Sequence, residues 1–182
     1  DECGISCGRM DQYAIAYGGV TFINTGIPPS AEVLPIAELP VVVGDSAEPR
    51  RAAEVLARTR ARLEAGDPVV LEAFERLHEY TLAGREALLA GDAARVGELM
   101  TLSQEEEKRI GASTEKIERL CAAARAAGAC GAKQMGAGGG GCMIAYCPGR
   151  EDEVAAVIDS EGGVSYKVGV GRMETTAVSD FG

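Results

Sequence analysis

The sequence has few aromatic residues, a single histidine and no excess of basic residues. It contains no Trp, three Phe and one His in 182 residues. Asp and Glu outnumber Lys and Arg by 28 to 18, which gives a formal net charge of -10. A nucleic-acid surface needs a clustered basic face, so this composition argues against one. The lone His78 lies in a strongly helical segment, and we interpret it as a surface or packed residue rather than a catalyst.

Long apolar runs are also lacking. No stretch is long and apolar enough to cross a bilayer, and the first residues lack the basic and apolar regions of a signal peptide. The composition therefore predicts a cytoplasmic protein that does not enter a membrane. The 46% of apolar residues suffices for one good-sized core or two small ones.

The six cysteines follow no recognised ligand pattern, and no metal site is predicted. Cys142 and Cys147 are five residues apart, so on one strand they would face opposite sides of the sheet. Cys3 and Cys7 could meet on a helical turn, but no second pair or nearby His completes a site. We interpret most of these cysteines as buried thiols.

The middle of the chain predicts a run of helices between two short strands. Residues 41–43 are β-branched and bounded by Pro40 and Gly44, as in a buried strand, with Asp45 and Ser46 placed to cap the next helix. That helix is expected to turn one face inward, made of Ala52, Leu56, Thr59 and Leu63. The sequence Gly66-Asp67-Pro68 ends it and starts another helix, and Gly91-Asp92 repeats the pattern.

The final helix of this run is predicted from about Ser113 to Gly128, with Ile117, Leu120, Cys121 and Ala124 inward. A strand over 142–147, a helix over 150–160 and two strands over 164–170 and 173–178 follow. Before Pro40, a helix from Gly8 to Tyr17, a strand over 19–23 and a proline-rich loop are predicted. Arg51, Arg58 and Arg62 share one helix face, which favours simple solvation over the alternative of binding an anion.

The most informative segment is a glycine run at 136–141, where five of six residues are glycine. Without a Cβ, such a loop adopts positive φ and presents bare N–H groups to an anion or to a closely packed substrate. A flexible linker is the alternative, but linkers are usually Gly/Ser mixtures rather than a loop between an Ala-rich helix and a strand. The run therefore predicts a binding loop.

A second candidate for chemistry is Asp11, which follows a glycine-bounded turn and opens a helix. Spacing alone favours a helix-start carboxylate that is satisfied by backbone donors and the macrodipole. The alternative is a carboxylate that orients or deprotonates a substrate hydroxyl.

Taken together, the segments at 7–12 and 136–141 resemble the GHMP kinase superfamily. The glycine run is similar to that family's third conserved motif, and Met10-Asp11-Gln12 resembles the site of its catalytic aspartate in galactokinases and heptose-phosphate kinases. Three other segments, at 41–46, 98–100 and 127–133, are similar to archaeal and bacterial mevalonate kinases. The resemblance covers nearly the whole chain.

This resemblance implies an α+β fold, with the ferredoxin-like antiparallel sheet and helices of the GHMP C-terminal domain over 41–182. Residues 1–40 would be a remnant of the N-terminal kinase domain. The strands after Pro40 and after the glycine run should share one sheet, covered by the helices between Ala47 and Gly128. The strand at 20–23 should pair with strands of the missing half, so its edge would invite a dimer or a second chain.

The implied activity is transfer of the ATP γ-phosphate to a small-molecule hydroxyl, with mevalonate the leading substrate. Asp11 would accept or orient the hydroxyl proton. Substrate and phosphate would be bordered by six loop residues: Gly136, Ala137, Gly138, Gly139, Gly140 and Gly141. A sugar or sugar-phosphate kinase, and a non-catalytic metabolite-binding module on the same fold, are the alternatives.

Two departures from the family pattern are visible. Met135 stands where a Thr commonly precedes the Gly-Ala-Gly run, so the hydrogen bond of that hydroxyl is absent. No run of the type Gly-Leu-Gly-Ser-Ser, which binds the ATP phosphates in this family, occurs in the sequence. The main elements for ATP and Mg²⁺ are therefore expected in a complementary N-terminal half. We expect the chain to be the C-terminal portion of a GHMP kinase, inactive by itself.

Overall fold

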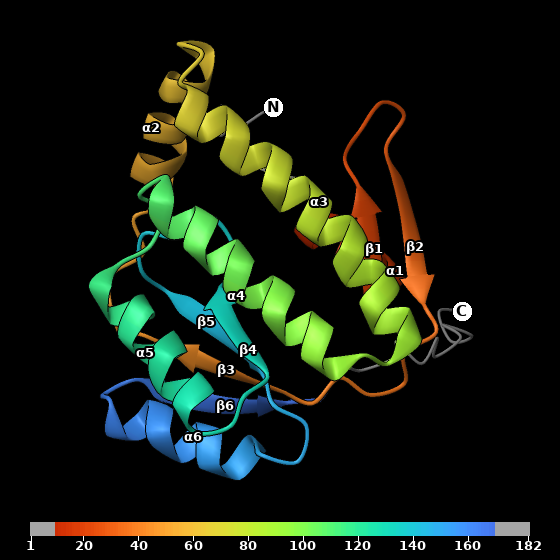
Figure 1. The fold of residues 1–182 in the computed structure, drawn as a ribbon, viewed down its shortest axis with the longest axis vertical. Helices are drawn as coiled ribbons and strands as arrows, with labels where there is room; N and C mark the ends of the chain where they lie inside the picture. Colours follow the sequence, from red (N-terminus) through yellow and green to blue (C-terminus); the bar gives the residue numbers. More distant parts are fainter. Residues whose placement is uncertain (1–9, 170–182) are drawn as a thin grey trace, which may run out of the picture. The chain divides into compact units, whose positions relative to one another are not determined.

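A computed structural model describes residues 10–169 of the chain (Figure 1). The described residues divide into two compact units, with the boundary between Glu38 and Leu39. Each unit is described by itself below. Within residues 10–169, no helix combines the length and the apolar character that a membrane span requires.

The first unit contains one helix and a two-stranded antiparallel sheet. Helix α1 is Met10–Tyr17, and strands β1, Val20–Asn24, and β2, Ser30–Leu34, pair with Val20 opposite Leu34. The helix and the first strand are as predicted. The predicted loop was wrong at β2, because its flanking prolines stand outside the strand, where no ladder hydrogen bond is lost. One edge of β1 is thus occupied by β2, whereas the sequence predicted partners from elsewhere.

The second unit is built on a four-stranded antiparallel sheet in the order β4-β5-β3-β6. Its strands are β3, Val41–Asp45; β4, Gly131–Gln134; β5, Cys142–Tyr146; and β6, Val164–Val168. Gly44 lies opposite Met143 on one side and Ser165 on the other. The predicted pairing of the strands after Pro40 and after the glycine run is confirmed. The strand predicted over 173–178 lies outside the described residues.

Five helices complete this unit: α2, Ala52–Glu64; α3, Pro68–Ala90; α4, Ala93–Arg109; α5, Glu115–Ala126; and α6, Glu151–Ser160. The predicted caps of α3 and α4 are confirmed, since the Asp67 carboxylate accepts from Val69 N and that of Asp92 from Arg95 N. The mixed α+β fold with an antiparallel sheet is also confirmed.

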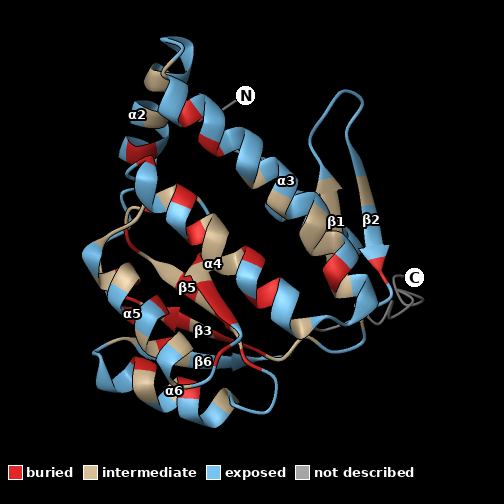
Figure 2. Ribbon diagram, in the orientation of Figure 1, coloured by how far each residue is buried: buried red, intermediate tan, exposed pale blue. Residues whose placement is uncertain are grey.

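The main core lies between the sheet and helices α5 and α6 (Figure 2). Buried side chains come from all three: Val42, Met143, Ala145, Ile117, Leu120, Cys121, Ala124, Val154 and Ile158. All four predicted inward residues of α5 are buried there. Helices α3 and α4 instead share a separate cluster around Ala87, Val96 and Leu99. The helices before Gly128 therefore supply only part of the predicted cover of the sheet.

Helix α2 departs from its predicted face and cap. Val55 is its one buried residue, and Leu56 is 49% exposed. The predicted caps close the preceding turn instead: the Asp45 carboxylate accepts from Ala47 N, and the Ser46 hydroxyl from Glu48 N. Residue Arg51 occupies the N-cap position without a side-chain hydrogen bond. A helix packed by a single residue leaves little apolar periodicity for the sequence to show.

Helix α4 lies on strand β4 at backbone contact distance. A Cβ at Gly97 would collide with the carbonyl group of Cys130, and one at Gly131 would collide with Gly97. Only glycines allow two backbones to approach so closely. Strand β4, which the sequence did not predict, is held against the helix in this way.

Candidate functional site

The glycine loop, residues 136–141, connects β4 to β5. All five of its glycines have positive φ, between 69° and 96°. This is the left-handed region that other residues avoid, so the sequence of the loop follows from its backbone. The prediction of positive φ is confirmed.

The protein's own backbone approaches the loop closely on one side. A Cβ at Gly138 would collide with the Ala112 carbonyl oxygen, and one at Gly140 would lie 2.8 Å from that of Pro49. A Cβ at Gly139 would lie 2.9 Å from the Val55 side chain. The sequence predicted that something must approach these glycines, and on this side the visitor is the chain itself.

Hydrogen bonds fix the loop between two neighbouring segments. Ser46 N donates to Gly141 O at 2.9 Å, and Arg51 N donates to Gly139 O at 2.8 Å. Gly139 N donates in turn to Ala112 O at 2.8 Å. The loop is thus tied to the β3–α2 connection and to the α4–α5 connection.

Several N–H groups of the loop stay available. Within residues 10–169, four of them donate no hydrogen bond: those of Gly136, Ala137, Gly138 and Gly140. Gly138 and Gly140 are moreover buried residues. A buried N–H group without a protein acceptor usually meets water or a ligand, and clustered N–H groups suit an anion.

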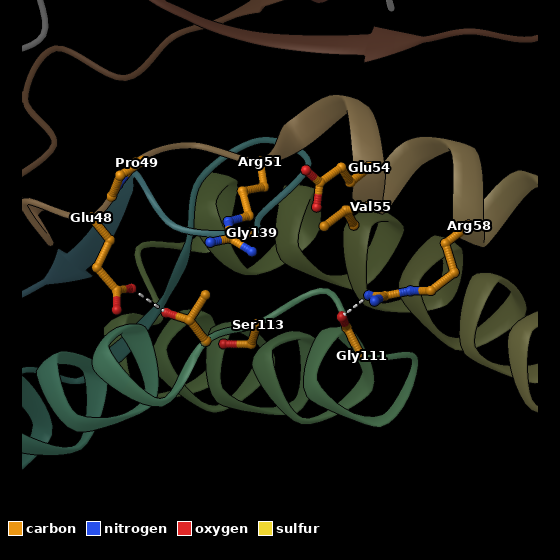
Figure 3. A pocket seen from close by; sticks show the side chains of 10 residues that line it. Glu48, Pro49, Arg51, Glu54, Val55, Arg58, Gly111, Ser113 and Gly139 are labelled. Atoms are coloured by element: carbon orange, nitrogen blue, oxygen red, sulfur yellow. Dashed lines mark hydrogen bonds between the residues drawn. The ribbon is translucent and has the colours of Figure 1, made fainter.

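A cavity of about 310 Å³ lies beside the loop (Figure 3). It is bounded by the β3–α2 connection, the start of α2, the α4–α5 connection and Gly139. Its lining is mixed in charge: Glu48, Pro49, Arg51, Glu54, Val55, Arg58, Gly111, Ser113, Thr114 and Gly139. In Figure 3 the Arg51 side chain reaches from the start of α2 toward Gly139.

Two of the charged groups have protein partners. The Glu48 carboxylate accepts from the Thr114 hydroxyl at 2.7 Å, and the Arg58 guanidinium donates to the Gly111 carbonyl oxygen (Figure 3). Arg62, the third arginine of the predicted face, lies away from the cavity and bonds Asp67 and the Ile110 carbonyl oxygen.

The arginines next to the loop have no carboxylate partner in the part of the chain that the structure describes. Arg51 lines the cavity, and the Arg50 side chain passes over Gly136 and Gly141. Neither forms an ion pair with a residue of 10–169. Two unpaired guanidinium groups beside unpaired N–H groups make this the surface on the second unit best suited to an anion.

A buried ion pair stands behind the loop. Lys133 Nζ lies 2.7 Å from Glu107 Oε1, and Glu107 Oε2 has no hydrogen-bond partner. Burial raises the pKa of the Glu107 carboxyl, and the nearby Lys133 ammonium only partly opposes this. The pair joins α4 to β4 immediately before the loop.

Asp11 is the second residue of α1 and is exposed to solvent. It belongs to the first unit, whereas the glycine loop belongs to the second. That both serve one site remains a prediction from the sequence, as do their roles.

The cysteines of the described segment are free thiols rather than a ligand set. Cys121 and Cys147 are buried, and burial raises their pKa values to about 12 and about 11. Such thiols stay protonated at neutral pH and are poor ligands. Cys130 is exposed and Cys142 half-buried, so fewer are buried than predicted; Cys3 and Cys7 lie outside the described residues.

Family membership follows from this fold and loop together with a direct match. Residues 85–163 match the family described as GHMP kinases C terminal, so the chain carries a GHMP kinase C-terminal domain. Among characterised proteins, it is similar to the mevalonate kinase of Pyrococcus horikoshii, with 37% identity over 174 residues. That match covers 93% of this chain and 51% of the relative, so the chain spans about half the relative's length.

Solved structures agree on the fold. The mevalonate kinase of L. major, in complex with R-mevalonate, matches 93% of this chain with a TM-score of 0.79 and 23% identity. The Lactococcus lactis galactokinase, complexed with galactose, matches 92% with a TM-score of 0.69 and 22% identity. The chain covers 55% of each of these two structures.

Proposed function

We propose that this chain is the C-terminal half of an ATP-dependent kinase that phosphorylates a small-molecule hydroxyl, most specifically that of mevalonate. The observation that carries the proposal is the glycine loop, with its unpaired N–H groups and two unpaired arginines. The 37% identity to a mevalonate kinase directs the choice of substrate.

In this proposal the loop residues stabilise charge. Phosphoryl transfer spreads negative charge over the transferring oxygens, and fixed N–H donors stabilise that charge without reorganising. The N–H groups of Gly136, Ala137, Gly138 and Gly140 are free for this task, and Arg50 and Arg51 add positive charge at the loop.

Asp11 would orient the substrate hydroxyl and accept its proton. Its exposed position at the start of α1 leaves the carboxylate accessible to a ligand. When bound, ATP supplies the phosphoryl group and Mg²⁺ neutralises its charge. Within residues 10–169 no group of three or more acidic, His or Cys residues could hold a metal, so we place the Mg²⁺ ligands elsewhere.

Residues 1–40 would then be the end of an N-terminal kinase domain, and residues 41–182 the C-terminal domain. Nucleotide binding would come from an N-terminal half, because the sequence contains no phosphate loop of the family type. The cytoplasm would be the site of action.

A sugar kinase is the second candidate. It is favoured by the galactokinase-like Met10-Asp11-Gln12 turn and by Met135, which stands in place of the usual Thr. A non-catalytic metabolite-binding module on the same fold is the third.

The test is an assay of the full-length gene product that carries this chain, with ATP–Mg²⁺ and a panel of mevalonate, galactose and sugar phosphates. We expect turnover of mevalonate, and Asp11→Asn to lower kcat about a hundred- to ten-thousandfold with the fold unchanged. The matched control is Asp92→Asn at the start of α4, where Asn also caps well and activity should persist.

Three results would count against parts of the proposal. Near-normal turnover in Asp11→Asn would remove this residue from the mechanism. Turnover of a sugar without turnover of mevalonate would overturn the substrate, and tight metabolite binding without any turnover would identify the binding module.

A further inference from the structure

A single buried amide, Gln104 on α4, contacts three elements that surround the glycine loop. The residue is 3% exposed. Its Oε1 accepts from Gln134 N at 2.7 Å, and its Nε2 donates to Ser113 Oγ at 2.9 Å and to Glu118 Oε1 at 2.7 Å. A backbone N–H on one side and a carboxylate on the other fix which end of the amide is oxygen.

The bond to Gln134 holds the entry to the loop. Strand β4 is an edge of the sheet, so N–H groups on its outer side have no strand partner. Gln134 is the last residue of β4, and Gln104 supplies the acceptor that a further strand would have supplied. The Gln134 side chain also lies against Gly138, where a Cβ would come within 2.5 Å of its Nε2.

The bond to Ser113 holds the opposite wall. Ser113 follows Ala112, whose carbonyl oxygen accepts from Gly139 N at 2.8 Å. Ser113 and Gly139 both line the cavity, whereas Gln104 does not. Gln104 therefore acts on the loop from two directions without touching the space where a ligand would lie.

We propose that Gln104 is a positioning residue that sets the conformation of the glycine loop for phosphoryl transfer. The inference rests on the proposed function for its catalytic consequence, but the loop geometry can be measured independently. An amide is specifically required here. A carboxylate would face Glu118 without donors, and an apolar side chain would leave the Gln134 N–H group unpaired.

The test compares Gln104→Met, which keeps the length of the side chain, with Leu99→Ala on the same helix. Leu99 is 3% exposed in the separate α3–α4 cluster, so its truncation destabilises α4 without touching the loop. Amide hydrogen exchange of Gln134 and Gly139 should accelerate about tenfold more in Gln104→Met than in Leu99→Ala, because a hydrogen bond near the loop is lost. Ser113→Ala removes one contact only and should give a smaller effect in the same direction, which keeps the test valid if Gln104→Met does not fold.

In the full-length protein, Gln104→Met should lower kcat about a hundredfold, as expected of an ångström-scale misplacement, and change KM little. Leu99→Ala should leave kcat near normal at temperatures where it is folded. Exchange at Gly139 that is equal in the two variants would overturn the positioning role, and so would an unchanged kcat. Accelerated exchange in a protein that turns over no substrate would retain Gln104 as the loop's anchor and refute the proposed function instead.

Discussion

At the scale of single residues, the glycine loop is shaped by contacts that leave no room for a side chain. Gly138 combines a φ of 78° with direct contact to the Ala112 carbonyl oxygen and the Gln134 amide. Gly149, in the turn before α6, has a similar φ of 72° but nothing within 4 Å of where a Cβ would lie. The two positions therefore separate the effect of backbone conformation from the effect of packing.

We expect Gly138→Ala to lower the free energy of unfolding by about 3 kcal/mol or more, because backbone strain and overpacking add. Gly149→Ala should cost only about 1 kcal/mol, which is the strain alone. Urea unfolding of both variants gives the comparison. Equal losses would show that the loop can move away from Ala112 and that its close packing is not rigid.

The contacts of the loop explain which site residues the sequence could reveal. Five glycines close together are visible in any reading, and so is an aspartate at a helix start. Glu48, Thr114 and Gln104 gave no comparable signal, because their partners lie far along the chain and no periodic pattern marks a cross-element hydrogen bond. The one available clue was Thr114 itself, a good cap residue directly before α5.

At the scale of elements, predictability follows how much of an element is decided locally. Helix α5 has a wide apolar face, and α3 and α4 begin at an Asp that follows Gly, so all three were predicted well. Strand β4 has only four residues, Gly131–Gln134, between an Ala-rich helix and the glycine run. Its existence depends on pairing with β5 and packing against α4, which are tertiary effects that local sequence does not encode.

The start of α5 offers a test at this scale. The Thr114 hydroxyl oxygen accepts from Ile117 N at 3.3 Å and its proton goes to Glu48, so one side chain caps a helix and tethers the β3–α2 connection. Thr114→Ala should lower the free energy of unfolding by about 1 to 2 kcal/mol, whereas Thr114→Ser should cost a few tenths at most. Thermal or urea unfolding measures both. A serine variant as unstable as the alanine variant would mean that the methyl group, not the hydroxyl, is what α5 requires.

At the scale of the whole molecule, the two units differ greatly in their cores. Within residues 10–38, Leu34 is the one buried hydrophobic side chain, and Ile15 is 73% exposed. The second unit buries residues from a four-stranded sheet and two helices. A helix with a two-stranded hairpin is at best marginally stable in water, so the two units should unfold separately.

Native-state hydrogen exchange on the intact chain tests this. Amides of β1 and β2 should be at least about a thousandfold less protected than those of β3 and β5, because an isolated hairpin opens at almost no cost while a domain core resists by about 5 kcal/mol or more. Protection of β1 equal to that of β3 would contradict this expectation and would show that the chain unfolds as one cooperative body.

The contact between Gly97 and the backbone at 130–131 also decides how the sheet can grow. An exposed edge strand is a template on which another chain can add by main-chain hydrogen bonding, the step that begins aggregation. With α4 seated directly on β4 and a glutamine amide on its outer N–H group, that edge has no room for an incoming strand. A further strand can join this sheet beyond β6 but not beyond β4, so two glycines also act as a guard against misassembly.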